Sequence, residues 1–558
     1  MTDRIIIVGG VAGGASLATR LRRLNETAEI VIYEAGPYIS FASCGLPYYV
    51  GGTIENRENL LVKTVAAMKA DFNIEVHVNS TVVNIEPDQK TIQIQIEGQT
   101  ELQTDHYQSL VLSTGVRPIQ PNLPGLDQAN NVFTVRTVPD VDEITAFMTT
   151  NRHANKYAVV VGGGFIGIEM AENLTQKGYH VTIVEAADQV MGNFDPEMAH
   201  FLHQHLQENG VQLMLGKKLA SFAEMGRKVV LDTGKQIPAD LVILAMGVRP
   251  NSELARVAEI ETDERGFIKV SDQYETSQKQ IYAIGDVISV VNGVTNQRQS
   301  IPLAGPANRQ GRLLADILNG LPKKDPKVIG TSVVKVFDFT AAATGVNEKQ
   351  LQQTNIDYQA MHLHPAAHAT YYPGAEAIEL KVLFDKQDGR ILGAQALGEK
   401  EVDKRIDMIA TAMRFGGKIT DLIDVEVAYA PPYASAKDPI NFAGYLGEDI
   451  QNGLVKTIQW SQVTQLLVDQ AFFLDVRDPA ELLAMPKLDG AVNIPRSEIR
   501  QRLAELPKEQ PIYVYCAVGL RGYNVCRILS QLGYDVYNID GGLKTYRMSQ
   551  YRIKPISL

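Results

Sequence analysis

Two glycine-rich turns, each set between an apolar run and an amphipathic run, constrain the fold of this chain more than any other feature. In the first, an apolar run at residues 4–8 leads into the glycine-rich stretch 9–14, and residues 15–24 then show a helical pattern. A second apolar run at 29–33 ends at Glu34, about 20 residues after the glycines, which is the spacing of a carboxylate that binds a ribose hydroxyl. This order predicts a βαβ unit that holds a dinucleotide.

One residue of this unit departs from the GxGxxG pattern, because Val11 stands in the place of the middle glycine. A lone imperfect motif is a weak signal, since an ordinary tight strand-to-helix turn carries similar glycines. A second copy strengthens the prediction: residues 157–161 are apolar, residues 162–167 match GxGxxG in full, and residues 181–184 lead to Glu185. Two units about 150 residues apart predict two dinucleotides, each with its pyrophosphate at a helix N-terminus.

Glu185 also bears on the choice of nicotinamide dinucleotide. Its carboxylate would accept a hydrogen bond from a free 2′-hydroxyl and would repel a 2′-phosphate. The second unit therefore favours NADH over NADPH, although nearby arginines can override a single carboxylate.

The composition indicates several domains in a reducing environment. At about 100–200 residues per domain, the 558 residues predict about three to five domains, each long enough to bury a core. Three cysteines, an odd number, exclude a disulfide scaffold, and a net charge of −11 argues against a nucleic-acid partner. The N-terminus lacks the pattern of a signal peptide, and no run of ~18 apolar residues occurs. We therefore expect a cytoplasmic protein with no membrane partner.

Two further segments repeat the tripeptide Val-Arg-Pro, at residues 116–118 and 248–250, each after an apolar run that ends in small residues. Residues 276–286 look like a strand that ends in Gly285 and Asp286. Together with the glycine turns, these segments resemble the pyridine nucleotide-disulfide oxidoreductase family, and the resemblance extends to about residue 447.

This resemblance implies that the first unit binds FAD and the second binds NADH or NADPH. It also implies that Asp286 binds the ribityl chain of the flavin, whereas a helix N-cap or turn aspartate is the structural alternative. The cofactor-binding positions that the resemblance implies are Gly9, Gly10, Val11, Ala12, Gly14, Glu34, Val82, Thr114, Gly115, Asp286, Leu303, Ala304, Gly162, Gly164, Phe165, Ile166, Gly167, Glu185 and Gly247.

Cys44 has no second cysteine near it, so the paired dithiol of glutathione and lipoamide dehydrogenases is absent. A lone redox cysteine works either as a sulfenate formed with peroxide or as a mixed disulfide with a small thiol. A buried structural cysteine is the alternative, but Gly45 and Pro47 indicate a shaped loop.

The segment around Cys44 resembles coenzyme A disulfide reductases, NADH oxidases and NADH peroxidases. The peroxidases carry a histidine at the position of Ala12, which makes peroxide reduction less plausible here. The first glycine motif instead resembles the coenzyme A disulfide reductase branch, although that branch usually has asparagine at the position of Ser43. The coenzyme A site that the resemblance implies consists of Ser16, Arg20, Arg23, Ser40, Ser43, Asn308, Arg309 and Lys437.

Two of these positions, and two tyrosines that the resemblance implies as catalytic residues, have a second interpretation. Arg20 and Arg23 share one face near the end of a helix, where they can bind a phosphate or simply complement the helix C-terminus. Tyr371 and Tyr429 match tyrosines that reach the active cysteine of the partner subunit, where a phenol could protonate a departing thiolate. Packing in a dimer interface is the alternative for both tyrosines.

The last 102 residues resemble a rhodanese domain, after a short polar linker expected at 448–456. An apolar run at 512–515 leads to Cys516, and a short loop with Arg521 precedes a helix expected at 523–532. Such a loop gathers backbone N–H groups at a helix N-terminus, which favours a thiolate and cradles a persulfide anion. Cys526, within that helix, is expected in the core.

The expected fold is α/β, with two Rossmann-like dinucleotide-binding domains, an α+β dimerisation domain and a C-terminal α/β rhodanese domain. We expect a homodimer that uses FAD, NADH or NADPH, and coenzyme A to reduce coenzyme A disulfide, coenzyme A persulfide or polysulfide. An NADH oxidase or peroxidase that cycles Cys44 through sulfenate, or a redox sensor, is the alternative. The expected domains are 1–118 and 251–327 (FAD), 119–250 (NAD(P)H), 328–447 (dimerisation) and 457–558 (rhodanese).

Overall fold

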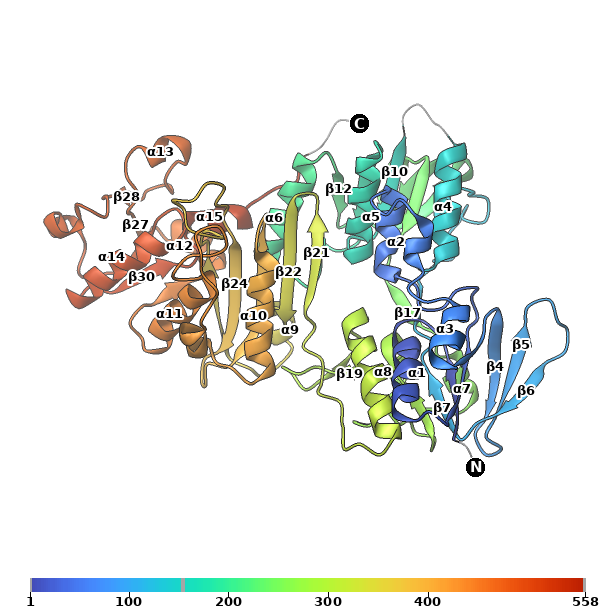
Figure 1. The fold of residues 1–558 in the computed structure, drawn as a ribbon. Coiled ribbons are helices and arrows are strands. Elements are labelled where there is room, and N and C mark those ends of the chain that lie inside the picture. The colour runs from blue at the N-terminus through green and yellow to red at the C-terminus, as the bar shows by residue number, and fades with distance from the viewer. Residues whose placement is uncertain (1–2, 152–155, 555–558) are drawn as a thin grey trace. The chain divides into compact units, whose positions relative to one another are not determined.

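The computed structural model describes residues 3–151 and 156–554, which form two compact units (Figure 1). The first unit contains the described residues up to Asp188 together with residues 214–328. The second contains residues 189–213 and 329–554. The expected NAD(P)H domain, 119–250, is therefore divided between the two units by its contacts.

The first glycine turn belongs to a five-stranded parallel sheet, whose central strand β1 has three isoleucines with at most 7% of their surface exposed. Residues 276–280, expected as part of a strand, are irregular: 277–278 form a bend and 279–280 a turn, in which Gln280 takes a left-handed backbone with φ +62°. The strands in spatial order are β18 (Ile281–Ala283), β7 (Ser109–Leu112), β1 (Arg4–Val8), β2 (Glu29–Tyr33) and β3 (Glu75–His77).

Helices α1 (Ala12–Leu24) and α8 (Ala304–Leu318) pack against each other beside this sheet. Gly311 permits this close approach, since a Cβ there would lie 2.5 Å from the backbone oxygen of Gly13. Helix α1 begins at Ala12 rather than at the expected Ala15, because the glycine turn itself forms the first helical turn, with Ala15 N–H donating to the Val11 carbonyl at 3.0 Å.

The second glycine turn lies in another parallel arrangement, in which β10 (Tyr157–Val161) pairs with β11 (His180–Glu185) and β16 (Leu241–Leu244). Helix α5 (Phe165–Gln176) follows the turn. The remaining elements of the first unit include β9 (Val132–Phe133), helices α2 (Leu46–Gly51), α3 (Val65–Phe72), α4 (Val138–Thr150) and α7 (Glu253–Val257), and two antiparallel sheets, β4 (Ser80–Glu86) to β6 (Gln103–His106) and β13 (Leu219–Ala223) to β15 (Gln236–Pro238).

The two Val-Arg-Pro repeats pair with each other. Strand β8 (Val116–Pro118) lies antiparallel to β17 (Val248–Pro250), with Arg117 opposite Arg249. Asn251 extends this ribbon, because its N–H donates to the Gly115 carbonyl at 3.0 Å. The repeat therefore marks the crossing between the two dinucleotide-binding parts of the first unit.

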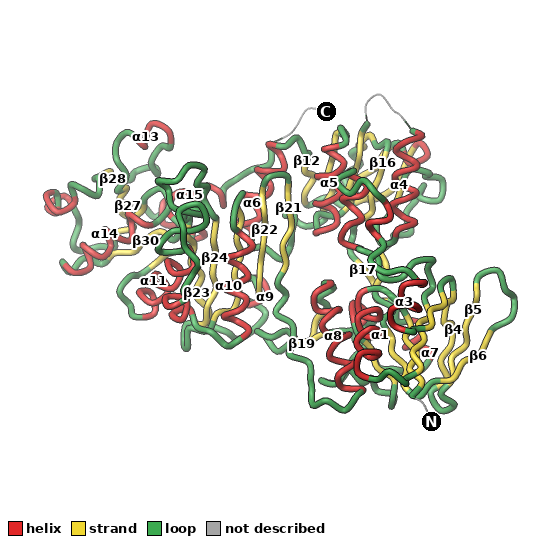
Figure 2. The backbone as a smooth tube through the Cα atoms, viewed as in Figure 1, coloured by secondary structure: helices red, strands yellow, loops and turns green. Residues whose placement is uncertain are grey.

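The second unit contains a five-stranded antiparallel sheet with two long helices, α10 (Val402–Arg414) and α11 (Pro439–Gln451), shown red against the yellow strands in Figure 2. Every residue of the strand β25 is buried. The strands in spatial order are β21 (Ser332–Val336), β22 (Phe339–Gly345), β25 (Ile391–Gly398), β24 (Glu379–Asp385) and β23 (Tyr358–Leu363).

The C-terminal part of the second unit is a parallel sheet with helices α12 (Trp460–Val468), α14 (Leu520–Gln531) and α15 (Gly542–Ser549). The expected linker at 448–456 is wrong in its first residues, since α11 continues to Gln451 and its residues Leu446 and Ile450 pack on the core of this sheet. The strands in spatial order are β26 (Thr457–Ile458), β30 (Val536–Ile539), β29 (Ile512–Tyr515), β27 (Phe472–Asp475) and β28 (Val492–Asn493).

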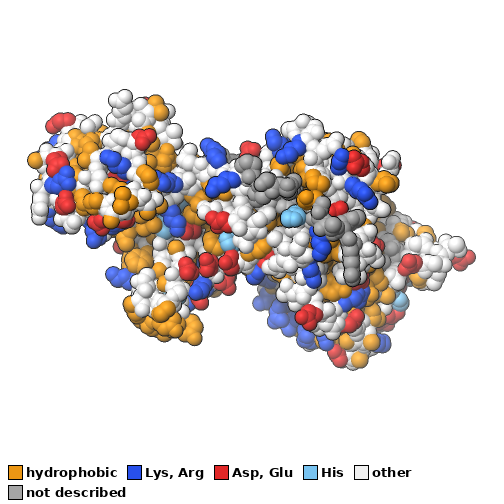
Figure 3. Space-filling view, turned by 90° about the horizontal axis from the view of Figure 1, so that it is seen from above, with side chains coloured by type: hydrophobic (Ala, Val, Ile, Leu, Met, Phe, Trp, Pro, Cys, Tyr) orange, Lys and Arg blue, Asp and Glu red, His pale blue; other side chains and the backbone are white. Residues whose placement is uncertain are grey.

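Acidic and basic side chains are mixed on the surface. The face in Figure 3 shows Lys and Arg among Asp and Glu on both units. Such mixing leaves no uniform positive field on this face. Within residues 3–151 and 156–554, no helix has the length and apolar character needed to cross a membrane.

Candidate functional site

The first glycine turn is a cradle that only glycine can form at its two ends. Gly9 has φ +100°, and a Cβ there would lie 2.3 Å from the backbone oxygen of Ser113. A Cβ on Gly14 would lie 1.9 Å from the oxygen of Gly9. These contacts hold the start of α1 against the end of β1, which is the geometry that receives a pyrophosphate.

The second turn repeats these contacts. A Cβ on Gly162, with φ +112°, would lie 2.1 Å from the Ala245 oxygen, and one on Gly167 would lie 1.9 Å from the Gly162 oxygen. At Gly164, the middle position, a Cβ would meet nothing within 4 Å. The protein itself therefore does not require glycine there, which explains how Val11 fits in the first turn.

An acidic side chain supports each turn from the end of the following strand. Glu34 accepts hydrogen bonds from the N–H groups of Gly10 at 2.8 Å and Gly36 at 2.9 Å. Glu185 accepts from the N–H of Gly163 at 2.7 Å and that of Ala187 at 2.8 Å. Burial raises the pKa of Glu34, and its bonds to the backbone oppose that shift. Both carboxylates stand where the ribose of a dinucleotide is expected.

The carboxyl ends of the neighbouring strands carry the other expected flavin residues. Asp286 lies in a short 3-10 helix after β18, 3.9 Å from the guanidinium of Arg136. Burial raises the pKa of this carboxyl, and Arg136 opposes the shift. Thr114, after β7, donates from its hydroxyl to the Asn251 carbonyl at 2.7 Å. Both residues follow the carboxyl ends of parallel strands, the usual place for a ligand in such sheets.

The structure places the remaining expected cofactor positions on strands, helix starts and loops of the first unit. Val82 is buried on β4, Gly247 precedes β17 with φ +98°, and Leu303 is the N-cap of α8. The other positions are Ala304, the first residue of α8, Phe165 and Ile166, the first residues of α5, and Gly115, where φ is +63°.

Cys44 lies in the 3-10 helix Ser43–Gly45, and its side chain is exposed in the single chain. The preceding Ser40 has a left-handed backbone with φ +46°, and its N–H donates to the Gly10 carbonyl at 2.9 Å. This bond attaches the cysteine segment to the first glycine turn. The exposed side chain of Cys44 contradicts the alternative of a buried structural cysteine.

Helix α2, which follows Cys44, packs on α5, the helix after the second glycine turn. A Cβ on Gly51 would lie 1.8 Å from the side-chain oxygen of Asn173. Glu169 on α5 is a further titratable group here, 3.5 Å from the Tyr48 hydroxyl, and burial raises its pKa to about 7. The sequence analysis missed Glu169, because only its position between two packed helices distinguishes it.

The expected coenzyme A residues of the first unit meet only in part. Ser16 on α1 hydrogen-bonds to Asn308 on α8, so these two come together as expected. Arg20 pairs with Asp316 at 2.8 Å, whereas Arg23 lies over the Phe72 ring at 5.2 Å. The two arginines thus have different partners.

Arg309 and Lys437 complete the expected coenzyme A set, and Tyr371 and Tyr429 are the two expected tyrosines. Arg309 donates to the Lys327 carbonyl at 3.5 Å. In the second unit, Lys437 is exposed, and the hydroxyls of Tyr371 and Tyr429 lie 2.6 Å apart. This hydrogen bond raises the pKa of Tyr371, whose side chain is exposed.

The loop after β29 contains Cys516, which is fully buried. Gly519, with φ +92°, is the N-cap of α14, which begins at Leu520 rather than at the expected residue 523. Arg521 makes a bidentate pair with Glu481, with N–O distances of 2.6 and 2.5 Å. Arg521 lowers the pKa of Glu481, and its own pKa is raised by Glu481 and by Cys516 nearby. Glu481 was not predicted, because it lies 40 residues from Arg521.

Two other residues of this domain have structural roles. Cys526 lies in the hydrophobic core, as expected, and burial raises the pKa of its thiol. Arg477 is buried, pairs with Asp475 at 2.6 Å and donates to the Met485 carbonyl at 2.8 Å. Cys44 is thus the exposed thiol, and Cys516 is the thiol enclosed in the rhodanese loop.

Comparison with known families agrees with this geometry. Residues 3–311 match the pyridine nucleotide-disulphide oxidoreductase family, and residues 331–439 match the dimerisation domain of the same family. This chain belongs to that family. Residues 459–549 match the rhodanese-like domain.

Similar proteins support the assignment of this oxidoreductase. A coenzyme A disulfide reductase of Staphylococcus haemolyticus is 35% identical over 448 residues, which are 80% of this chain and all of the relative. The reduced CoADR-RHD of Bacillus anthracis is 46% identical, with a TM-score of 0.96 over 98% of each chain. An NAD-dependent persulfide reductase from A. fulgidus is 35% identical, with a TM-score of 0.90 over 97% of this chain and 100% of that one.

Membership of this family makes the chain a flavin-dependent oxidoreductase that takes electrons from a pyridine nucleotide. The residues present fit both groups, since each glycine turn brings a helix N-terminus close against the end of a strand, and a carboxylate lies beside each turn. When bound, FAD passes the electron pair of the nicotinamide to an acceptor. Gly9, Gly14, Glu34 and Asp286 would hold the flavin dinucleotide, and Gly162, Gly167 and Glu185 the nicotinamide dinucleotide.

Proposed function

We propose that this oxidoreductase reduces coenzyme A disulfide, coenzyme A persulfide or polysulfide with electrons from NADH or NADPH. The observation that carries the proposal is the pair of unlike thiols in one chain: an exposed Cys44 attached to the flavin-side turn, and a Cys516 enclosed in a rhodanese loop. The names of the Staphylococcus, Bacillus and A. fulgidus relatives support the same substrates.

Cys44 would act as the nucleophile. Its thiolate attacks the coenzyme A sulfur of a coenzyme A persulfide, a Cys44–coenzyme A disulfide forms, the S–S bond of the persulfide breaks, and hydrosulfide leaves. With coenzyme A disulfide the leaving group is coenzyme A thiolate. Two electrons and one proton from the reduced nicotinamide, which bound FAD would relay, would then restore the Cys44 thiolate and release coenzyme A as the thiol.

The rhodanese loop would supply the sulfane sulfur. Cys516 thiolate takes one sulfur atom from a polysulfide and becomes a persulfide, while the polysulfide leaves shortened by one atom. Coenzyme A thiolate then attacks the outer sulfur, which gives coenzyme A persulfide and restores the Cys516 thiolate. Arg521, held by Glu481, places positive charge beside the persulfide anion.

Several residues would bind or position the substrate in a homodimer. Ser16 and Asn308 form one polar pair, and Arg20, Arg23, Arg309 and Lys437 would contact the phosphates of coenzyme A. The Tyr371–Tyr429 pair has a hydroxyl hydrogen bond and an exposed position, which suit a proton donor to the departing thiolate. The dimerisation domain match supports the homodimer.

The deciding experiment compares hydrosulfide release with oxygen consumption during NADH oxidation. Under anaerobic conditions, NADH oxidation with coenzyme A persulfide should release one hydrosulfide per NADH. Mass spectrometry of the untreated protein should find coenzyme A linked to Cys44. Oxygen consumption at a similar rate, without hydrosulfide release and without coenzyme A on Cys44, would instead establish an oxidase that works through a sulfenate.

A further inference from the structure

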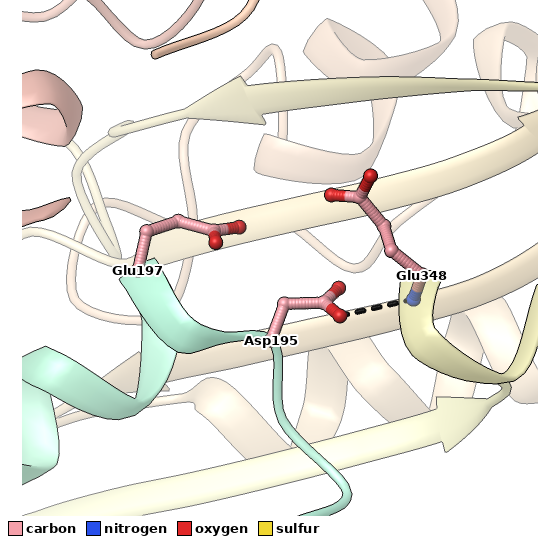
Figure 4. A group of neighbouring side chains, drawn as sticks. All are labelled: Asp195, Glu197 and Glu348. Atoms are coloured by element: carbon pink, nitrogen blue, oxygen red, sulfur yellow. Dashed lines mark hydrogen bonds between the residues drawn. The ribbon is translucent and has the colours of Figure 1, made fainter. Parts of the chain in front are cut away.

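A buried cluster of charges joins distant segments in the second unit. Asp195 and Glu197 come from the start of α6 (Pro196–Glu208), and Glu348 begins α9 (Glu348–Leu351) (Figure 4). The Glu348 N–H donates to Asp195 at 2.9 Å, drawn as the dashed line. Lys381 of β24, fully buried, supplies the cation: its Nζ is 2.8 Å from Asp195 and also pairs with Glu197 and Glu348. The ammonium therefore occupies the place that a metal ion would take among these carboxylates.

His362 of β23 extends this cluster to the rhodanese domain. Its Nε2 lies 3.0 Å from Glu197, and its Nδ1 lies 2.6 Å from Asp540. The His362 backbone N–H also donates to Asp540 at 2.9 Å. Burial disfavours the charged ring, but Asp540 and Glu197 outweigh burial and the repulsion of Lys381, and they raise the pKa of His362 to about 9. A protonated ring then donates to both carboxylates.

Asp540 is followed by two glycines that touch His362 on one side and the cysteine loop on the other. Gly541 has φ +67°, and a Cβ there would lie 2.8 Å from the Cβ of His362. Gly542 has φ +66°, and a Cβ there would lie 2.7 Å from the backbone oxygen of Cys516. Such close contacts leave residues 540–542 little freedom to move independently of either neighbour.

The first turn of α15 then supports the cysteine loop directly. The Leu543 N–H donates to the Cys516 carbonyl, and the Lys544 N–H donates to the Ala517 carbonyl, each at 2.9 Å. The same turn has a second attachment to the antiparallel sheet domain. Lys544 pairs with Glu379 through its ammonium, and the Thr545 hydroxyl lies 2.8 Å from Nε2 of His364.

We propose that His362 and Asp540 are positioning residues for sulfur transfer at Cys516. The ion cluster holds residues 541–544, and these residues hold the loop whose N–H groups receive the persulfide. Replacing a buried ion cluster by apolar side chains is often neutral for stability. We therefore infer that this cluster fixes the geometry of the loop rather than adding to stability. The functional part of this proposal rests on the proposed sulfane-sulfur role of Cys516.

The test uses the full-length flavin-loaded enzyme with Asp540→Asn and His362→Gln. In each variant we expect sulfur transfer from inorganic polysulfide to coenzyme A to fall by about tenfold or more, since small displacements of a reacting group are costly. We expect alkylation of the enclosed Cys516 by iodoacetamide to become faster by a similar factor, because the loop opens. Reduction of coenzyme A disulfide through Cys44 should change by less than about twofold. The nearly unchanged reduction of coenzyme A disulfide distinguishes positioning at Cys516 from a general loss of stability, which would impair both activities.

Arg405→Gln is the matched control. Arg405 is equally buried in the antiparallel sheet domain and pairs with Asp438 at 2.7 Å, outside the ion cluster. Its loss should lower stability without altering either Cys516 rate. If the Asp540 variant does not fold, Lys544→Met, at the partly exposed second attachment, should show the same pair of changes at smaller size.

Two results would overturn the proposal: unchanged alkylation of Cys516 in the Asp540 and His362 variants, or equal changes in the Arg405 control. Failure of the proposed function gives a different result. In that case the unaltered enzyme transfers no sulfur from polysulfide, while the alkylation rates of Cys516 still report whether the cluster positions the loop.

Discussion

The two reactive cysteines lie in opposite kinds of surroundings. Cys44 is exposed on a 3-10 helix attached to the flavin-side glycine turn, whereas Cys516 is fully buried in a loop supported by α15 and accompanied by Arg521. An open thiol suits attack on a large disulfide next to a flavin, and an enclosed thiol suits the carriage of one sulfur atom. The difference indicates that the two thiols have separable roles, and the following predictions test that separation.

The largest effect should come from Cys44→Ser. Without this nucleophile, NADH-dependent turnover of coenzyme A disulfide, coenzyme A persulfide and polysulfide should fall by about 10³-fold or more, because a hydroxyl cannot form the mixed disulfide. The flavin absorbance should remain, since the glycine cradle is unchanged. Substantial turnover of any of the three substrates would show that Cys44 is not their common nucleophile.

Cys516→Ser should have a selective effect. Turnover of polysulfide should fall by about tenfold or more, whereas reduction of coenzyme A disulfide should change by less than about twofold, because only the first needs a persulfide carrier. Parallel NADH oxidation assays on both substrates measure the ratio. Equal activity on polysulfide would mean that the enclosed thiol takes no part in turnover.

Glu481→Gln should weaken sulfur transfer at Cys516 by about tenfold, the lower end for loss of a charged hydrogen bond, because the pair is partly exposed. The neutral amide no longer holds the Arg521 guanidinium in its bidentate position. Asp478→Asn is the matched control, since its carboxylate lies 3.7 Å from Arg521 and is more exposed. An equally large loss of sulfur transfer in the Asp478→Asn variant would indicate that the total negative charge near Arg521 matters and the bidentate geometry does not.

The smallest effect concerns pH and the support of the Cys516 loop. The folded-state pKa of His362, about 9, lies above the ordinary value of 6.5. Its contribution to stability is therefore fully present below about pH 6.5 and is lost as the pH rises through about 9. The groups that face this ring are Glu197, Asp540 and Lys381.

Urea denaturation of the enzyme and of His362→Gln measures this contribution. The difference in free energy of unfolding should be largest near pH 6 and should shrink toward pH 9.5. In the same range, alkylation at Cys44 should not follow the His362 transition. A difference that stays constant with pH would show that the ring is neutral in the folded protein.

The local parts of this architecture followed from the sequence because they depend on neighbouring residues. Gly9 and Gly162 precede helices, Gly14 and Gly167 lie in the first turns of those helices, and all four allow backbone contacts that a Cβ would prevent, so their spacing alone predicted both turns. The polar run at 448–456 predicts a linker, but α11 continues through its first residues to Gln451. Its apolar residues Leu446 and Ile450 pack on the rhodanese core, a contact that no local pattern shows.

The amino-acid sequence by itself determined the set of domains and the two reactive cysteines, because glycine turns, apolar strands and a cysteine loop are short-range patterns. The tertiary structure decided which charges meet. Glu481 reaches Arg521 across 40 residues, and His362 reaches Asp540 across 178. Such pairs form only when folding brings distant segments together. For the buried His362 and Asp540, burial also makes a charge without a partner costly and thereby selects the contact.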